Sequence, residues 1–254
     1  MTGYPSPGPE LRQQALMRRL DQGQPLTLAA AARQFGVSSD TIRRDLKALQ
    51  DRGLARVIRG GALPVARPVR PTLERLGEGA EQIRRLVDAA LPLIRDGMAI
   101  GLDGGTTVLA LAQSLPPLPG SLVVTPAPAV ALASLAAGIP TQLVGGRLSA
   151  SGAISVGHAA VDALSGSALD LAFLGVCGLE AGFGLGADDL DESEVKRAMI
   201  AAGHRSVALT LQAKIGRRAR HRVASCDRIS LLITDASVAQ TAALAATGLE
   251  VRNV

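Results

Sequence analysis

The chain of 254 residues contains few aromatic and sulfur-bearing side chains, and these shortages limit what the protein can be. It has no Trp, one Tyr and three Phe, so a hydrophobic core must be built from aliphatic residues. Its two cysteines, Cys177 and Cys226, lie far apart in sequence and lack the spacing of zinc ligands. This cysteine usage argues against a disulfide framework or a zinc site and suits a reducing cytoplasm.

Several segments and motifs are also missing. The N-terminus, MTGYPSPGPE, lacks the features of a signal peptide, and no uninterrupted apolar run is long enough to span a membrane. The chain has no GxSxG elbow, no Walker A motif and no HExxH motif. Its three histidines, at positions 158, 204 and 221, show no ligand spacing. We therefore expect a soluble, cytoplasmic protein that is not an enzyme and needs no metal, cofactor or membrane.

Positive charge is concentrated at the N-terminal end. Residues 1–70 carry 12 Lys or Arg against 5 Asp or Glu, whereas the remaining residues carry 15 against 17. Such asymmetry favours a nucleic-acid-binding end joined to a near-neutral body, although a basic surface can also serve only solubility. Three prolines in LPVARPVRPT, residues 63–72, prevent a continuous helix and indicate a linker. We predict domains over residues 1–62 and 76–254, joined by a linker over 63–75.

The first domain has the pattern of three short helices followed by a hairpin. Thr27 and Ser38 can cap helices, and Gly36 permits a left-handed turn between them. We expect helices over residues 11–21, which GQP would stop, over 28–35, and from residue 39 until Gly53 ends the third. In the third helix the spacing of Ile42, Leu46 and Leu49 gives one apolar face. The strand LARVI and a basic turn at residues 59–61 complete a winged helix-turn-helix, whose second paired helix enters the major groove of DNA.

Polar and basic side chains occupy the rest of that third helix and the turn. Such arginines can contact guanine or phosphate, and the sequence leaves that choice open. A solvated helix face is the alternative for each residue taken singly. The predicted DNA-binding residues are Ser38, Ser39, Thr41, Arg43, Arg44, Lys47 and Arg59.

Residues 35–62, FGVSSDTIRRDLKALQDRGLARVIRGGA, resemble the N-terminal signature of the DeoR-type (DeoR/GlpR) family of bacterial transcription regulators. Arg59 stands where that family commonly has His, so a basic side chain remains at the wing. The resemblance implies a repressor with double-stranded operator DNA as its partner. Because one winged helix makes few contacts, we also expect a homodimer or homotetramer.

Beyond residue 75 the pattern is α/β. Apolar strands are expected at residues 98–102, 121–125, 141–144, 170–175, 206–211 and 229–234, with helices at 80–93, 108–115 and 127–136. Continuous apolar runs that alternate with helices predict a largely parallel sheet covered on both faces.

The segment IGLDGGTTVLALAQSL reads as a strand, a Gly-rich turn at residues 103–107 and a helix. Gly104 and Gly105 would let backbone N–H groups approach a ligand, and the helix N-terminus would add free donors. Thr106 and Thr107 would add hydroxyl groups. These features suit a phosphate, although such turns are often only structural.

Further segments occur in the order of the DeoR-family sensor domain, namely Val124-Thr125, Gly145-Gly146, residues 173–175, residues 194–199 and residues 214–216. The resemblance implies a fold similar to ribose-5-phosphate isomerase and coenzyme A transferases, and a phosphorylated sugar or related metabolite as effector. The effector-binding residues it implies are Asp103, Gly104, Gly105, Thr106, Thr107, Gly145, Gly146 and Lys214.

Two departures bear on the effector. Leu211 and Ala213 stand where the family often has Asp and Ser, and Pro126 replaces a common Asn. Loss of the Asp would leave a ligand donor unpaired, so we expect a less hydroxylated effector or weak binding.

Other segments admit two interpretations. Residues 178–189 would form a mobile loop over a pocket or simply a turn, and the acidic run at 188–194 would start a helix rather than bind a metal. The arginines at 217–222 would lie in a solvated loop or take part in an anion or interdomain contact, and Cys177 would pack rather than react.

Three functional hypotheses remain at this point. The first is a transcription regulator whose operator affinity depends on a phosphorylated metabolite. The second is a sugar-phosphate isomerase-like enzyme with a DNA-binding appendage, in which Asp103 would serve as the base. The third is a DNA-binding protein that ignores metabolites.

Overall fold

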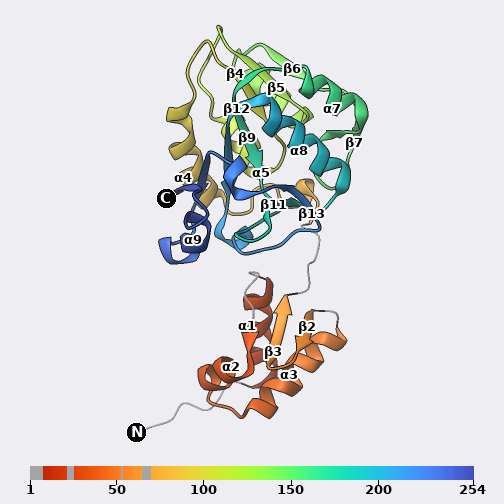
Figure 1. Cartoon of the computed structure of the whole chain (residues 1–254), viewed down its shortest axis with the longest axis vertical. Coiled ribbons are helices and arrows are strands. Elements are labelled where there is room, and N and C mark those ends of the chain that lie inside the picture. The colour runs from red at the N-terminus through yellow and green to blue at the C-terminus, as the bar shows by residue number, and fades with distance from the viewer. Residues whose placement is uncertain (1–7, 22–25, 53, 65–69) are drawn as a thin grey trace. The chain divides into compact units, whose positions relative to one another are not determined.

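The computed structural model describes residues 8–21, 26–52, 54–64 and 70–254. The chain forms two compact units that divide between Arg67 and Pro68 (Figure 1). Each unit has a hydrophobic core of its own. The predicted helix stops at residues 23–25 and Gly53, and part of the predicted linker, lie outside the described residues.

The N-terminal unit contains three helices and a small antiparallel sheet. The helices are α1 (Pro9–Asp21), α2 (Leu28–Phe35) and α3 (Ser39–Asp51), and the strands are β1 (Leu26–Thr27), β2 (Ala55–Ile58) and β3 (Gly61–Pro64), in the order β1-β3-β2. This confirms the predicted winged helix-turn-helix. The sequence did not indicate β1, because two residues are too few to show a period.

The predicted caps set the ends of α2 and α3. The hydroxyl of Thr27 accepts a hydrogen bond from the Ala30 N–H at 3.2 Å, and that of Ser38 accepts one from Thr41 at 3.1 Å. Gly36 has a φ of 63°, as a left-handed turn requires. The apolar face of α3 is fully buried, through Ile42, Leu46 and Leu49.

The wing turn needs its two glycines for different reasons. Gly60 has a φ of 92°, a backbone conformation that residues other than glycine rarely adopt. A Cβ at Gly61 would lie 1.9 Å from the carbonyl oxygen of Leu26, so β1 could not pair closely with β3. The strand continues through Pro64 into the predicted linker, and its last two residues lie beyond the part that pairs with β1.

The C-terminal unit is built on a seven-stranded sheet in which every neighbouring pair is parallel. Its order is β15-β14-β12-β9-β4-β5-β6. The strands are β4 (Ala99–Leu102), β5 (Leu122–Thr125), β6 (Thr141–Leu143), β9 (Leu169–Gly175), β12 (Gly203–Thr210), β14 (Leu231–Thr234) and β15 (Glu250–Asn253). The α/β prediction and the parallel sheet are confirmed. The edge strand β15 was missed, because its sequence EVRN lacks an apolar run.

Helices cover both faces of this sheet. They are α4 (Ala80–Ala90), α5 (Thr106–Gln113), α6 (Pro128–Ala136), α7 (His158–Ser165), α8 (Leu190–Ala202) and α9 (Val238–Ala245). Helices α4, α5 and α6 pack in one row, and α7 packs with α8. From β4 through β5 to β6 the chain proceeds toward one edge of the sheet, whereas from β9 to β12 it proceeds toward the other edge. Right-handed crossovers therefore place α5 and α8 on opposite faces.

Short elements complete the unit. They are the 3-10 helices η1 (Thr72–Arg75), η2 (Leu91–Leu93), η3 (Gln212–Lys214) and η4 (Cys226–Arg228), and the strands β7 (Arg147–Leu148), β8 (Ser155–Val156), β10 (Gly178–Glu180), β11 (Gly184–Ala187) and β13 (His221–Ala224). The expectation of a loop or simple turn at residues 178–189 was wrong, because β10 and β11 form a hairpin that pairs with β13. A Cβ at Gly184 would lie 2.1 Å from the Ala224 carbonyl oxygen, so the lack of a side chain at this position lets β11 approach β13 closely.

The direction of the chain changes between β4 and β9, which are neighbours in the sheet. In open α/β sheets, ligands bind in the crevice outside the carboxyl ends of strands at such a switch point. The loop that follows β4 begins at Asp103 and leads into α5. The helix starts at Thr106, two residues earlier than its sequence pattern indicated.

Candidate functional site

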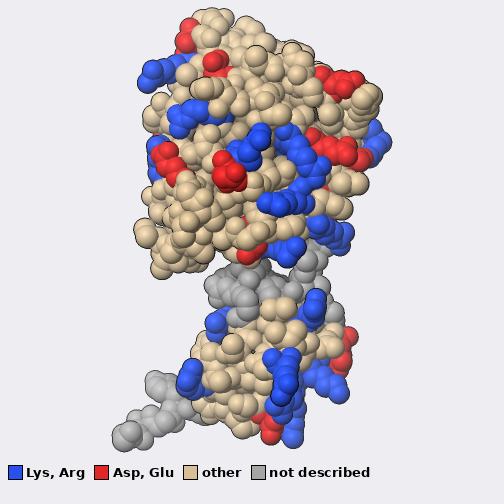
Figure 2. Space-filling model, in the orientation of Figure 1, with Lys and Arg blue, Asp and Glu red and all other residues tan. Residues whose placement is uncertain are grey.

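The N-terminal unit presents the predicted DNA-binding residues at its surface. Exposed members are Ser38, Ser39, Arg43, Arg44, Lys47 and Arg59, and Thr41 is half-buried. All but two lie on α3, where Ser38 is the cap, and Arg59 lies in the turn between β2 and β3. Lys and Arg outnumber Asp and Glu on the visible face of this unit (Figure 2). Basic side chains are therefore exposed both on α3 and in the turn of the wing.

The arginines of this surface differ in their contacts. Arg43 forms an exposed ion pair with Asp40, whereas Arg44 has no ion pair within the described part of the chain. Arg52 and Arg56 are also exposed, next to the end of α3 and on β2. The sequence prediction omitted both, although the in-out alternation of β2 could have identified Arg56.

A buried ion pair fixes α3 against α1. Arg12 and Asp45 are 5% and 4% exposed, and the Arg12 Nε lies 2.5 Å from Asp45 Oδ2. The Gln13 side chain donates a further hydrogen bond to Asp45 Oδ1 at 3.1 Å. Helical spacing places Asp45 on the same face as Ile42 and Leu49, but its partner is 33 residues away and could not be identified from the sequence. The orientation of the basic helix thus depends on a carboxylate that faces inward.

In the C-terminal unit a cavity opens at the carboxyl ends of β4, β9 and β12. It brings together six predicted effector-binding residues: Asp103, Gly104, Gly105, Thr106, Thr107 and Lys214. Its other lining residues include Arg70, Thr72, Arg75, Ser151, Cys177, Glu192, Lys196 and Leu211, none of which was predicted to bind the effector. The Gly-rich turn of residues 103–107 and Lys214 therefore line the same cavity, together with cations from two further elements.

Gly145 and Gly146 are not among the residues that line this cavity. They follow β6 and precede β7, and Gly146 has a φ of 147°. A Cβ at Gly146 would lie 2.7 Å from the Val156 carbonyl oxygen. This close approach gives Gly146 a packing role, and its contact with an effector stays a prediction.

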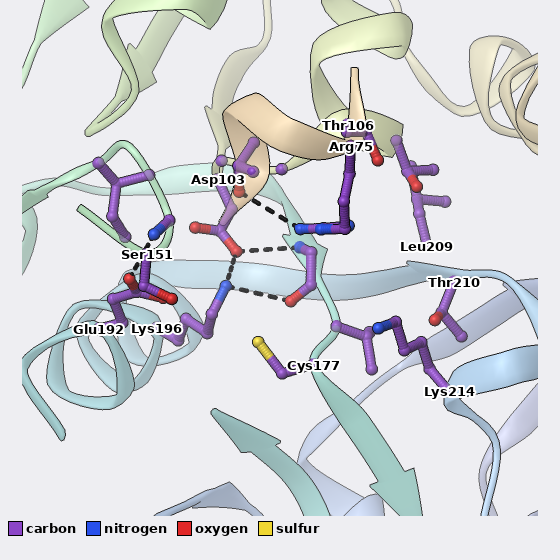
Figure 3. Close-up of a pocket in the computed structure, with 18 of the residues that line it drawn as sticks. Arg75, Asp103, Thr106, Ser151, Cys177, Glu192, Lys196, Leu209, Thr210 and Lys214 are labelled. Carbon is purple, nitrogen blue, oxygen red and sulfur yellow. Dashed lines mark hydrogen bonds and ion pairs between the residues drawn. The ribbon is translucent and has the colours of Figure 1, made fainter. Parts of the chain in front are cut away.

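At the centre of the cavity Asp103 is fully buried beside Lys196 (Figure 3). Lys196 Nζ donates to Asp103 Oδ2 and, at 3.1 Å, to the Gly175 carbonyl oxygen. The Gly175 N–H also donates to Asp103 Oδ2, at 2.9 Å. Burial is the largest single influence on the pKa of Lys196 and lowers it, but the charge of Asp103, the hydrogen bond to Asp103 and the nearby Cys177 and Glu192 together outweigh burial, and the net shift is upward. Within the described residues Asp103 Oδ1 is buried without a partner, so it can accept a hydrogen bond from a ligand.

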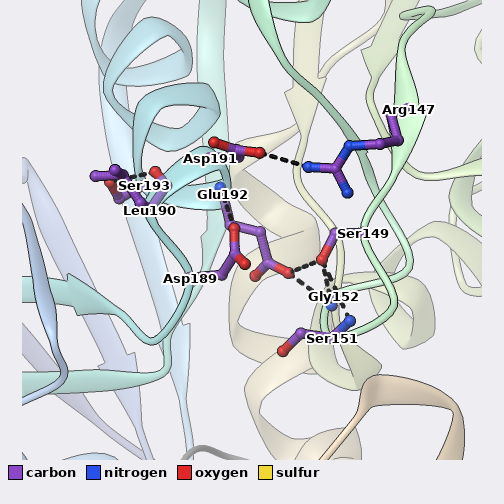
Figure 4. Close-up of polar contacts among 9 residues, drawn as sticks. All are labelled: Arg147, Ser149, Ser151, Gly152, Asp189, Leu190, Asp191, Glu192 and Ser193. Carbon is purple, nitrogen blue, oxygen red and sulfur yellow. Dashed lines mark hydrogen bonds and ion pairs between the residues drawn. The ribbon is translucent and has the colours of Figure 1, made fainter.

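Glu192 holds the neighbouring loop in place (Figure 4). Its Oε1 accepts hydrogen bonds from the Ser149 hydroxyl at 2.5 Å and from the Gly152 N–H at 2.7 Å. The Asp189 carboxylate caps α8 by accepting from the Glu192 N–H at 3.0 Å. The acidic run thus starts a helix, as predicted. Glu192 lines the cavity from that helix.

The cations of the cavity wall lie in a poorly solvated environment. Burial, followed by the charges of Arg217 and Arg75, lowers the pKa of Lys214 to about 8. Burial also lowers the pKa of Arg75. The Arg217 Nη2 donates to both carboxylate oxygens of Asp188, at 2.8 and 3.0 Å, so the expectation of a solvated loop was wrong for this residue. Burial raises the pKa of the Cys177 thiol, which disfavours the reactive thiolate.

The first turn of α5 supplies N–H groups that have no partner within the helix, because the first four donors of any helix lack one. No side chain caps this helix, and Gly105 precedes it with a φ of 99°. A Cβ at Gly104 would lie 2.2 Å from Ile154 Cγ2, so the loop is also closely packed. A helix N-terminus with free donors and nearby cations attracts an anion.

No helix in the described part of the chain is both long enough and apolar enough to cross a membrane.

Comparisons with known proteins match both units of the chain. The DeoR-like helix-turn-helix domain matches residues 12–66, and the DeoR C-terminal sensor domain matches residues 79–236. The glycerol-3-phosphate regulon repressor of Escherichia coli is 30% identical over 80% of this chain and 81% of its own length. The repressor GlcR of Bacillus subtilis is 30% identical over 89% of this chain and 88% of its own length. The regulator GlpR of Haloferax volcanii is 29% identical over 91% of both chains.

Among solved structures the similarity is more distant. The full-length sorbitol operon regulator SorC from Klebsiella pneumoniae covers 94% of this chain and 99% of its own, at 15% identity and a TM-score of 0.42. Ribose 5-phosphate isomerase A from Methanocaldococcus jannaschii covers 54% of this chain and 55% of its own, at 16% identity and a TM-score of 0.40.

A winged helix joined to an α/β unit with a ligand cavity defines a DNA-binding transcription regulator with a sensor domain. Both domain matches, one of which spans most of the second unit, assign the chain to a family. It belongs to the DeoR family of transcription regulators.

Proposed function

We propose that this protein represses transcription from an operator and that a small phosphorylated metabolite controls its affinity for DNA. The observation that carries the proposal is the cavity at the β4–β9 switch point. It combines the N-terminus of α5 with Arg75, Lys196 and Lys214. These groups suit a phosphate, and the free Asp103 Oδ1 suits one hydroxyl group of the same ligand.

The relatives support both halves of this proposal. One is named as a glycerol-3-phosphate regulon repressor, which links repression to a phosphorylated metabolite in that protein. Leu211 lines the cavity where the family often has an acidic residue, which favours a ligand with few hydroxyl groups. We infer a cytoplasmic protein that binds DNA as a homodimer or homotetramer, since one recognition helix reads only a half-site.

In the isomerase-like alternative Asp103 would act as the base, through one carboxylate oxygen. A general base needs an oxygen that can reach a substrate proton, and Oδ2 is already occupied by Lys196 and the Gly175 N–H. Only Oδ1 remains. Isomerase activity on a pentose phosphate, tested with the purified chain, would favour this alternative.

Replacing Arg44 with Ala should weaken binding to duplex DNA selected in vitro for tight association. Arg44 is exposed on α3 without an ion pair in the described structure, so it can contact a phosphate or a base. If the contact is a phosphate, the slope of log K against log salt should fall by about one unit. Fluorescence anisotropy over a salt series measures both quantities. Arg84→Ala, on α4 of the other unit, is the control; equal binding by the Arg44 variant and wild type would contradict the assignment of α3.

Replacing Thr106 with Val should abolish stabilisation by phosphorylated metabolites. The Thr106 hydroxyl lies at the start of α5 in the cavity, and valine keeps its volume but cannot bond an anion. A ligand at about one hundred times its Kd stabilises the native state by about 2.7 kcal/mol, which a thermal-shift assay detects. Thr141→Val is the matched control, because the Thr141 hydroxyl bonds the Ile139 carbonyl outside the cavity. An unchanged ligand response in the Thr106 variant would contradict phosphate binding at residues 103–107.

A further inference from the structure

Arg75 enters the effector cavity from the N-terminal end of the second unit. It is the last residue of η1, the first helix or strand that the structure describes in that unit. The Thr72 N–H donates to the Ser151 carbonyl oxygen at 2.8 Å, so the backbone of this segment rests on the loop that Glu192 holds. The Arg75 guanidinium then reaches into the space that Asp103 and Thr106 also line (Figure 3). The C-terminal end of the predicted linker thus forms part of the ligand site.

The guanidinium of Arg75 has no anionic partner there. Its Nε donates to the Arg70 carbonyl oxygen at 2.8 Å, and its Nη2 donates to the Thr72 hydroxyl at 3.4 Å. Both acceptors are neutral and belong to its own segment. Within the described residues no carboxylate lies at ion-pair distance from Arg75, whereas nearby Arg70 pairs with Glu78. A partly buried cation without a counterion is unfavourable unless something else supplies the negative charge.

A second cation increases this imbalance. Lys214 reaches the cavity from η3, and the charge of Arg75 contributes to the lowered pKa of Lys214. The opposite wall carries the N-terminus of α5, which also favours negative charge. Asp103 lies among these groups, but its Oδ2 is taken by Lys196 and Gly175. An oxyanion between α5 and Arg75 would therefore supply negative charge to positive groups of three elements, namely α5, η1 and η3.

We propose that Arg75 completes the anion site and ties the segment of residues 70–76 to the occupied cavity. This inference rests on the proposed function, since it requires that the cavity bind a phosphorylated ligand. An Arg side chain can grip two oxygens of one phosphate, so occupancy restrains η1 as well as the guanidinium. Because η1 is the first described element of the second unit, the ligand restrains the part of that unit that follows the DNA-binding unit in the sequence. Such coupling requires that the ligand interact differently with the two states, and the Arg75 contact provides that difference.

Hydrogen exchange of the full-length protein, measured by mass spectrometry, tests this inference. The probe is inorganic phosphate in excess, compared with chloride at equal ionic strength. In the wild type, phosphate should slow exchange at residues 103–109 and also at residues 70–76. In Arg75→Gln the slowing at 103–109 should persist, that at 70–76 should disappear, and the Kd for phosphate should rise about tenfold, or about 1.4 kcal/mol.

Two further variants separate charge and folding from the proposed contact. Arg75→Lys keeps the charge but loses the two-pronged grip, so slowing at 70–76 should be partial. Arg84→Gln removes an exposed arginine of the same unit and should leave both effects intact. Melting temperatures in chloride should be similar for all variants, because Arg75 makes only neutral contacts there.

The outcomes distinguish this inference from the function on which it rests. Slowing at 103–109 without slowing at 70–76 in the wild type would overturn the role of Arg75 and leave the phosphate cradle standing. Slowing at neither segment would overturn both. Slowing at 70–76 that survives Arg75→Gln would show that η1 responds through another contact, and the inference would be wrong.

Discussion

Replacing Asp45 with Ala should destabilise the N-terminal unit by roughly 3–5 kcal/mol, which is the usual effect of removing one partner of a buried ion pair. Arg12, which is 5% exposed in the wild type, would lose its carboxylate partner. Gln13 would also lose its acceptor on α3. Because the chain has two units, a single unfolding curve does not isolate this effect. Hydrogen exchange of the amides of α3 does, and their protection should fall by several orders of magnitude.

Asp40→Ala provides the matched control on the same helix. Asp40 also pairs with an arginine, Arg43, but both side chains are more than half exposed. Exposed pairs contribute about 0–1 kcal/mol, so protection of α3 should barely change. Equal effects of the two substitutions would show that burial does not determine how much the Arg12–Asp45 pair contributes to the stability of the N-terminal unit. The Asp45 variant should also lose DNA affinity without any change to an exposed residue of the recognition surface, because α3 would no longer be held in place.

The winged helix could be predicted from the sequence because short-range signals define it. Caps at Thr27 and Ser38, the turn at Gly36 and the apolar spacing of α3 each involve residues a few positions apart. The Arg12–Asp45 pair could not be predicted in the same way. Helical spacing places Asp45, unlike exposed Asp40, on the apolar face of α3, but its partner Arg12 is 33 residues away and meets it only through the packing of α1 on α3.

The same distinction applies to the cavity. The loop after β4 could be recognised locally, since a strand, glycines and a helix follow one another in the sequence. Arg75 and Lys196 precede and follow that loop by many residues, and they meet it only because the switch point brings η1 and α8 to the carboxyl ends of the strands. The β10–β11 hairpin was missed for a different reason. Its strands pair through glycines such as Gly184 and Gly186, which leave no alternation of apolar and polar side chains.

Replacing Lys196 with Met should destabilise the C-terminal unit by roughly 3–5 kcal/mol, because it leaves Asp103 as a buried charge without its counterion. Met keeps much of the volume of the Lys side chain, so the loss reports on charge rather than on a cavity. Asp103 is fully buried and would retain only the hydrogen bond from the Gly175 N–H. Calorimetry together with hydrogen exchange at β4 and β9 measures the change in the unit that contains the pair.

A second substitution tests whether charge is the cause. In Lys196→Met combined with Asp103→Asn, the buried group is neutral, so most of the stability should return; a double-mutant cycle measures the coupling. Arg147→Met is the exposed control, because its pair with Asp191 lies near the surface and should contribute at most about 1 kcal/mol. Failure of Asp103→Asn to rescue the Lys196 variant would mean that the ammonium acts through its bond to the Gly175 carbonyl. The hydrogen bond to Gly175 at the end of β9, rather than the Asp103 carboxylate, would then account for the stability that Lys196 contributes.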